Sequence, residues 1–152
     1  MVFRRMENTN LIIHGDISYG GVRSFSALRR RKDPTTNALF VFNRNPYDGT
    51  DVTWNGLRLA EQLLNIGLEV KIFLMNDSVD LARDAATPPE GYFDLGEMLK
   101  QLIGKSVPVK VCGTCKVRCG IHKGEPYFEG AQEAKMTELT QWIKETDKVI
   151  SF

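Results

Sequence analysis

Residues 38–74 decide the fold, because they read ALFVF at 38–42 and VKIFL at 70–74 on either side of a helical pattern. Both runs are mostly apolar, as expected of strands buried on both faces of a sheet. Asp51 is placed to cap the helix and Gly67 to end it. A strand–loop–helix–strand unit of this length predicts two parallel strands. The apolar residues at helical spacing between the strands are Trp54, Leu57, Leu59, Ala60, Leu63 and Leu64.

Downstream of this unit the chain continues to alternate helical and strand patterns. Such alternation predicts one layered α/β domain with a mostly parallel sheet. We expect helices at 78–83, 95–103 and 136–145, strands at 107–111 and 149–152, and a turn at 126–130 that can hold a short edge strand.

Composition and charge exclude several classes of protein. The 152 residues are 42% hydrophobic and 26% charged, which is typical of a soluble globular domain. No apolar run approaches the roughly 20 residues needed to span a bilayer, so we expect no membrane association. A net charge of +1 gives no reason to expect nucleic-acid binding. The first residues lack the apolar segment of a secretory signal, and we therefore expect a cytoplasmic protein.

The basic charge is concentrated before the first strand. Residues 1–36 hold seven Arg or Lys against three Asp or Glu, whereas residues 37–152 carry an excess of acids. We see no sustained strand or helix period in residues 1–36 and predict a flexible basic extension ahead of a domain at 37–152. A transit peptide and a basic arm that contacts RNA or a partner are the alternatives.

All three cysteines lie in the segment CGTCKVRCGIH at residues 112–122. An odd, clustered count is a poor disulfide framework in a reducing cell and indicates redox, metal-binding or nucleophilic chemistry. The segment follows a predicted parallel strand, at the sheet end where open α/β folds bind ligands. A helix beginning here would direct its N-terminal amides at Cys112 or Cys115 and favour the thiolate. The nearby cations Lys110, Lys116, Arg118 and His122 would add to this effect.

Three interpretations of the cluster compete. Reactive thiol chemistry is the one we favour, because a thiolate is the form of cysteine that attacks sulfur. The second is a zinc site formed by Cys112, Cys115, Cys119 and His122, which requires a non-helical segment, since ligands on one helical stripe lie too far apart to surround an ion. The third is that the cysteines pack as small apolar side chains. Under the second or third interpretation the protein would be a metal-binding or oligomeric interaction module.

Other motifs are absent or weak. Neither G-x-x-x-x-G-K-[ST] nor a G-x-G-x-x-G after the first strand occurs, so we expect no nucleotide cofactor. No G-x-S-x-G elbow supports a serine hydrolase. Asn43, Arg44 and Asp48 follow the first strand, at the same sheet end as the cysteines. They either line the site, with Arg44 stabilising a thiolate, or belong to a solvated loop.

The CGTC motif at 112–115, followed by Gly120-Ile121, resembles the signature of YchN-like members of the DsrE/DsrF-like family. The resemblance extends over residues 37–152. It includes NPYDG at 45–49, GLEVKIFLMND at 67–77 and DKVISF at 147–152. It implies a three-layer α/β fold similar to flavodoxin, a homotrimer or homohexamer, and no cofactor.

The resemblance also implies a function. Several relatives carry sulfane sulfur as a cysteine persulfide and pass it to a partner, which makes this chain a sulfur carrier or a sulfurtransferase-like enzyme. Its partners would be donor and acceptor proteins or small sulfane-sulfur compounds. The active cysteine eight residues before the motif glycine corresponds to Cys112, and the added cysteine of YchN-like members corresponds to Cys115. Cys119 stands where the family has arginine, with Arg118 displaced by one, and it could supply a resolving thiol. The residues expected to line the site are Asn43, Arg44, Asp48, Gly113, Thr114 and Arg118.

Overall fold

The computed structural model describes residues 36–152, which form a five-stranded sheet in the order β4-β3-β2-β1-β5. Every neighbouring pair of strands is parallel. The strands are β1 (Asn37–Phe42), β2 (Glu69–Leu74), β3 (Val109–Cys112), β4 (Ala131–Ala134) and β5 (Lys148–Ser151). The helices are α1 (Val52–Asn65), α2 (Leu95–Gly104) and α3 (Met136–Glu145), with short 3₁₀ helices η1 (Asn76–Ala82) and η2 (Thr114–Lys116).

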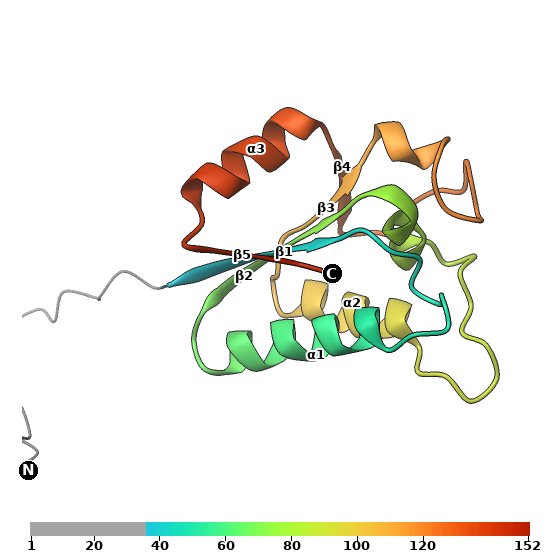
Figure 1. The fold of residues 1–152 in the computed structure, drawn as a ribbon, viewed down its shortest axis with the longest axis horizontal. Helices are drawn as coiled ribbons and strands as arrows, with labels where there is room; N and C mark the ends of the chain where they lie inside the picture. The colour runs from blue at the N-terminus through green and yellow to red at the C-terminus, as the bar shows by residue number, and fades with distance from the viewer. Residues whose placement is uncertain (1–35) are drawn as a thin grey trace, which may run out of the picture. The chain divides into compact units, whose positions relative to one another are not determined.

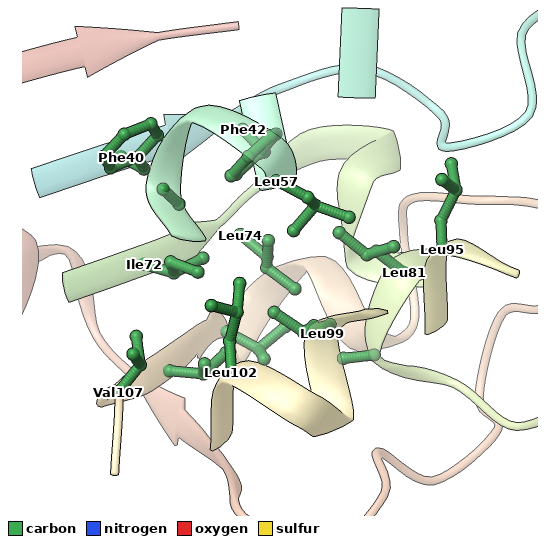
Figure 2. Close-up of a cluster of buried hydrophobic side chains, with 14 of the residues drawn as sticks. Phe40, Phe42, Leu57, Ile72, Leu74, Leu81, Leu95, Leu99, Leu102 and Val107 are labelled. Atoms are coloured by element: carbon green, nitrogen blue, oxygen red, sulfur yellow. The ribbon is translucent and has the colours of Figure 1, made fainter. Parts of the chain in front are cut away.

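The elements form three layers (Figure 1). Helices α1 and α2 cover one face of the sheet, and α3 covers the other. Successive residues of β1 point to opposite faces of the sheet, so the strand contributes side chains to the hydrophobic cores on both faces. Phe40 and Phe42 face the α1–α2 layer, whereas Leu39 and Val41 pack with Trp142 of α3. Figure 2 shows the larger core, in which the β1 and β2 side chains face Leu57, Leu99 and Leu102. The expected three-layer α/β fold is therefore confirmed.

The residues at the two ends of α1 explain one end and not the other. Gly67 has a φ of +93°, and the backbone N–H groups of Gly67 and Leu68 donate to the carbonyls of Leu64 and Leu63. This pair of bonds is a Schellman motif, in the place where glycine was expected to end the helix. Asp51 precedes α1 as expected, but its side chain makes no capping hydrogen bond.

The sheet differs from expectation at its β4 edge. The strand lies at residues 131–134, after the 126–130 turn, and β3 begins two residues later than predicted. The extension expected at residues 1–36 lies outside the described residues except for its last position. Within residues 36–152, no helix is long and apolar enough to cross a membrane.

Because all strands are parallel, their carboxyl ends meet at one edge of the sheet. Three segments follow those ends there: the first loop (residues 43–51) after β1, η1 after β2, and the cysteine loop (residues 113–122) after β3. Helices η1 and η2 contact each other. The fold thus brings the cysteines, η1 and the first loop to the same sheet edge.

Candidate functional site

The cysteines follow β3 without an intervening α-helix. The expected helix N-terminus is replaced by the three-residue 3₁₀ helix η2, in which Cys115 is the central residue. A single 3₁₀ turn lacks the aligned peptide dipoles of a longer helix. The sequence predicted that a helix dipole would stabilise a thiolate here, but the structure places no helix long enough to do so at the cysteines.

The geometry instead brings Cys112 and Cys115 into direct contact. The Cys115 thiol is directed at the Cys112 sulfur as a hydrogen-bond donor, and the two sulfur atoms are in direct contact. Cys112 is half-buried at the end of β3, whereas Cys115 is only 8% exposed. All three cysteines, which lie within the described residues, are free thiols. The pair therefore consists of one accessible sulfur and one covered thiol behind it.

Burial governs the chemistry of Cys115. Desolvation, followed by its hydrogen bond with Cys112, raises the pKa of Cys115 to about 12. The backbone N–H of Asn76 opposes this rise, and the Cys119 thiol, also within hydrogen-bonding reach, adds to it. Cys115 is therefore a protonated donor at neutral pH, and the half-buried Cys112 and Cys119 are the accessible thiols.

The cations near the cysteines are mostly engaged elsewhere. Lys110 Nζ lies 2.6 Å from Glu138 Oε1 and over the Trp142 ring, and Lys116 pairs with Glu133. The Lys110 hydrogen bond is the main reason that the pKa of Glu138 lies below its usual value. The carboxylates of Glu138 and Glu133 therefore offset the positive charges of Lys110 and Lys116, which the sequence analysis expected to act on the thiols.

The cysteine loop is held by three side chains from the η1 region, Asp77, Asp80 and Arg83, which we call the η1 clamp. Arg83 Nη1 lies 2.6 Å from Asp80 Oδ1, and both side chains are about 1% exposed or less. The Arg83 guanidinium also donates to the backbone carbonyls of Lys116, at 2.5 Å, and Cys119, at 3.3 Å. The buried ion pair thus ties down the middle of the cysteine loop.

The carboxylates of the η1 clamp hold the second half of the loop. Asp80 Oδ2 accepts from the Ile121 N–H at 2.6 Å, and Asp77 Oδ1 accepts from the Gly120 N–H at 2.8 Å. Gly120 has a φ of +79°, and a Cβ there would lie 2.3 Å from Asp80 Oδ1. Glycine is therefore required at position 120 both by the backbone conformation and by the close carboxylate.

Sequence reasoning identified 78–83 as a short helix but missed the η1 clamp. A signal was present, because Asp77, Asp80 and Arg83 recur at intervals of three immediately after a buried strand. Residues three apart lie on one face of a 3₁₀ helix, which has three residues per turn. Since β2 neighbours β3, that face lies beside the segment that follows β3.

The residues of the first loop bond mainly within the loop or to β5. Asn43 Nδ2 donates to Ser151 Oγ at 2.8 Å, and Arg44 pairs with Asp48 at 2.8 Å. Asp48 also accepts from the Thr50 hydroxyl, which is the main cause of its lowered pKa. The expected role of these residues in lining the cysteine site stays a prediction. From the same loop it is Asn45 that reaches the η1 clamp, with Nδ2 3.4 Å from Asp80 Oδ2.

Two hollows flank the cysteine loop. Gly113 and Thr114 line a groove of about 440 Å³ together with Glu133, Lys135 and Glu138. His122 lines a second pocket, of about 230 Å³, that also includes Tyr47. Arg118 is exposed. Within residues 36–152, no three His, Cys, Asp or Glu side chains are arranged to hold a metal ion, and this includes the four residues of the alternative zinc interpretation.

Comparisons with known proteins agree with this fold and motif. Residues 36–152 match the model of the DsrE/DsrF-like family. The protein YchN of Escherichia coli K12 is 38% identical over 118 residues, which cover 75% of this chain and 97% of YchN. An uncharacterised protein of Methanopyrus kandleri is 39% identical over 112 residues, covering 74% and 90% of the two chains. The crystal structure of E. coli YchN aligns with a TM-score of 0.67 and 34% identity, over 78% of this chain and all of that one. This chain therefore belongs to the DsrE/DsrF-like family, which is associated with sulfur relay, and is a YchN-like member of it.

Proposed function

We propose that this protein carries sulfane sulfur as a persulfide on Cys112 and passes it to the thiol of a partner. The observation that carries the proposal is the direct contact between Cys112 and Cys115, in which a half-buried sulfur accepts a hydrogen bond from a covered thiol. Cys115 is the weaker candidate for loading, because burial keeps it protonated and a thiol must ionise before it attacks sulfur. Cys119 remains the second accessible thiol.

The loading and transfer steps need no external oxidant. In loading, the Cys112 thiolate attacks the outer sulfur of a persulfide or polysulfide donor, a new S–S bond forms, and the donor leaves as a thiolate. In transfer, a partner's thiolate attacks the outer sulfur of the Cys112 persulfide. The S–S bond to Cys112 breaks, the outer sulfur stays on the partner, and Cys112 is released as a thiolate. The Cys115 hydrogen bond stabilises that departing charge, since bonds to ionised acceptors are the stronger ones.

The test is mass spectrometry of the reduced protein before and after exposure to polysulfide. Wild type should gain sulfur atoms that reductant removes. Cys112→Ser should lose the adduct, whereas Cys119→Ser should keep it and serves as the matched control. Loading that survives in Cys112→Ser and disappears in Cys119→Ser would move the carrier role to Cys119. No adduct in any sample would overturn the proposal.

The sulfur donor and acceptor, the cytoplasmic location and the trimeric or hexameric assembly accompany this proposal as predictions. Light scattering of the purified chain would measure the assembly directly. An assembly that is neither a trimer nor a hexamer would show that this expectation does not carry over to the present chain.

A further inference from the structure

We propose that the η1 clamp keeps Cys115 covered and thereby prevents a Cys112 persulfide from discharging as hydrosulfide before a partner thiol takes the sulfur. This inference rests on the proposed function. It assigns Asp77, Asp80 and Arg83 as positioning residues, which act through the cysteine loop and do not touch the sulfur themselves.

The discharge that must be prevented is a short, balanced step. The Cys115 thiolate would attack the inner sulfur of the Cys112 persulfide and form a Cys112–Cys115 disulfide. The bond between inner and outer sulfur would break, and the outer sulfur would leave with the electron pair as hydrosulfide. The proton given up by Cys115 would go to solvent or to hydrosulfide. Because the two sulfur atoms are already in contact, distance alone offers little obstacle.

What opposes this step is the covered, protonated state of Cys115, and the η1 clamp maintains it. Arg83 holds the carbonyl of Lys116, the residue directly after Cys115, and the carbonyl of Cys119. Cys119 in turn donates its N–H to the Cys115 carbonyl at 2.9 Å. The segment from the Cys115 carbonyl to Cys119 is therefore tied to one buried ion pair.

The far end of the loop is fixed by the same group. Asp80 and Asp77 accept from the Ile121 and Gly120 N–H groups, and Gly124 N–H donates back to the Lys116 carbonyl of η2, so this turn cannot lift without breaking these bonds. Burial is also the largest cause of the pKa of about 12 at Cys115. Loosening the loop would admit water, return this pKa toward its ordinary value of about 8.5, and make Cys115 a competent nucleophile.

The experiment compares Asp77→Ala and Asp80→Asn with wild type, and Asp84→Asn is the matched control. Asp77 is exposed and lies outside the buried ion pair, so its substitution should leave the fold intact. Asp84 lies on the same segment but pairs with Lys100 at the surface. The reduced full chain is pulsed with iodoacetamide between pH 7 and pH 10, and fragment ions separate Cys112 from Cys115. The melting temperature of each variant is recorded alongside.

We expect Cys115 to be labelled about 3–10 times faster in Asp77→Ala and faster still in Asp80→Asn, with its pH profile shifted to lower pH. Asp84→Asn should match wild type. After polysulfide loading, the two clamp variants should release hydrosulfide sooner and accumulate a Cys112–Cys115 disulfide. A purely structural role would lower the melting temperature without shifting the pH profile of Cys115 in the folded protein.

Equal Cys115 labelling and equal persulfide lifetime in wild type and both clamp variants would overturn the inference. The labelling arm needs no bound sulfur, so it separates the two proposals. If wild type never loads sulfur, the proposed function fails and the protective role fails with it. The labelling result then still decides whether the η1 clamp covers Cys115.

Discussion

The first loop and the cysteine loop lie at the same edge of the sheet but are stabilised in opposite ways. The first loop satisfies much of its polarity within a few residues: Asn45 accepts from the Tyr47 N–H, Asp48 accepts from Thr50, and Arg44 pairs with Asp48. The cysteine loop instead depends on Asp77, Asp80 and Arg83, which lie 33 to 43 residues away in sequence. The first loop is held largely by bonds among its own residues, with further bonds to β5 and Asp80, whereas the cysteine loop is held by a distant buried ion pair.

This difference has an energetic consequence. An exposed ion pair such as Arg44–Asp48 contributes little, because water screens both charges. A buried pair such as Asp80–Arg83 need not add net stability either, but losing one partner leaves the other as an uncompensated buried charge. Among the described residues, Arg83 Nε already has no hydrogen-bond partner. The cysteine loop should therefore be far more sensitive to substitution than the first loop.

Asp80→Asn should produce the largest effect. It removes the charge facing Arg83 while nearly preserving shape, and it should lower the free energy of unfolding by about 3–5 kcal/mol. Urea denaturation followed by circular dichroism would measure this loss. A loss below about 1 kcal/mol would show that the ion pair is dispensable.

Gly120→Ala and Gly49→Ala provide a matched pair between the loops, because the two glycines have φ values of +79° and +81°. At Gly49 a Cβ would meet nothing within 4 Å, so only backbone strain of about 1 kcal/mol is expected. At Gly120 the same strain is joined by the clash with Asp80 Oδ1, and about 2–4 kcal/mol is expected. Urea midpoints of the two variants check the comparison, and equal losses would show that Asp80 moves aside freely.

The same contrast explains which features could be predicted from the sequence. Helix α3 has the predicted bounds, and Gly67 ends α1 as expected, because these depend on local periodicity and backbone conformation. The edge strand β4 was placed too early, because AQEA at 131–134 is mostly exposed and lacks a strand-like alternation. The cysteine motif and its position after β3 could also be predicted from the sequence.

The helix anticipated at the cysteines illustrates the limit of local reasoning. Cysteine spacings of three and four fit a helical stripe, but the chain turns at Gly120, where it is held by Asp77 and Asp80 of a different strand's loop. A contact across more than 40 residues has no local period. Only the interval of three among Asp77, Asp80 and Arg83 hinted at it.

Alkaline pH should weaken the cysteine loop by a smaller amount. The pKa values of Cys115 and Tyr127 are both raised to about 12, chiefly by burial. In the unfolded chain these groups ionise near 8.5 and 10, so above pH 8.5 the folded state holds protons that the unfolded state releases. Their stabilising contribution is therefore complete below about pH 8.5 and declines as pH rises toward 12. Urea midpoints should fall from pH 8 to pH 10, and the fall should be shallower in Cys115→Ala.

Asp48→Asn should have the smallest effect, because the first loop can lose one of its bonds and still keep the others. Its side chain is 20% exposed, its partner Arg44 is 48% exposed, and the lowered pKa of Asp48 reflects hydrogen bonds with Thr50 that an amide oxygen can also accept. We expect the free energy of unfolding to change by less than about 0.5 kcal/mol at neutral pH. The rate of Cys112 labelling should stay that of wild type. If labelling slowed markedly, the first loop would be shown to act on the cysteines after all, and the separation between the two loops would no longer hold.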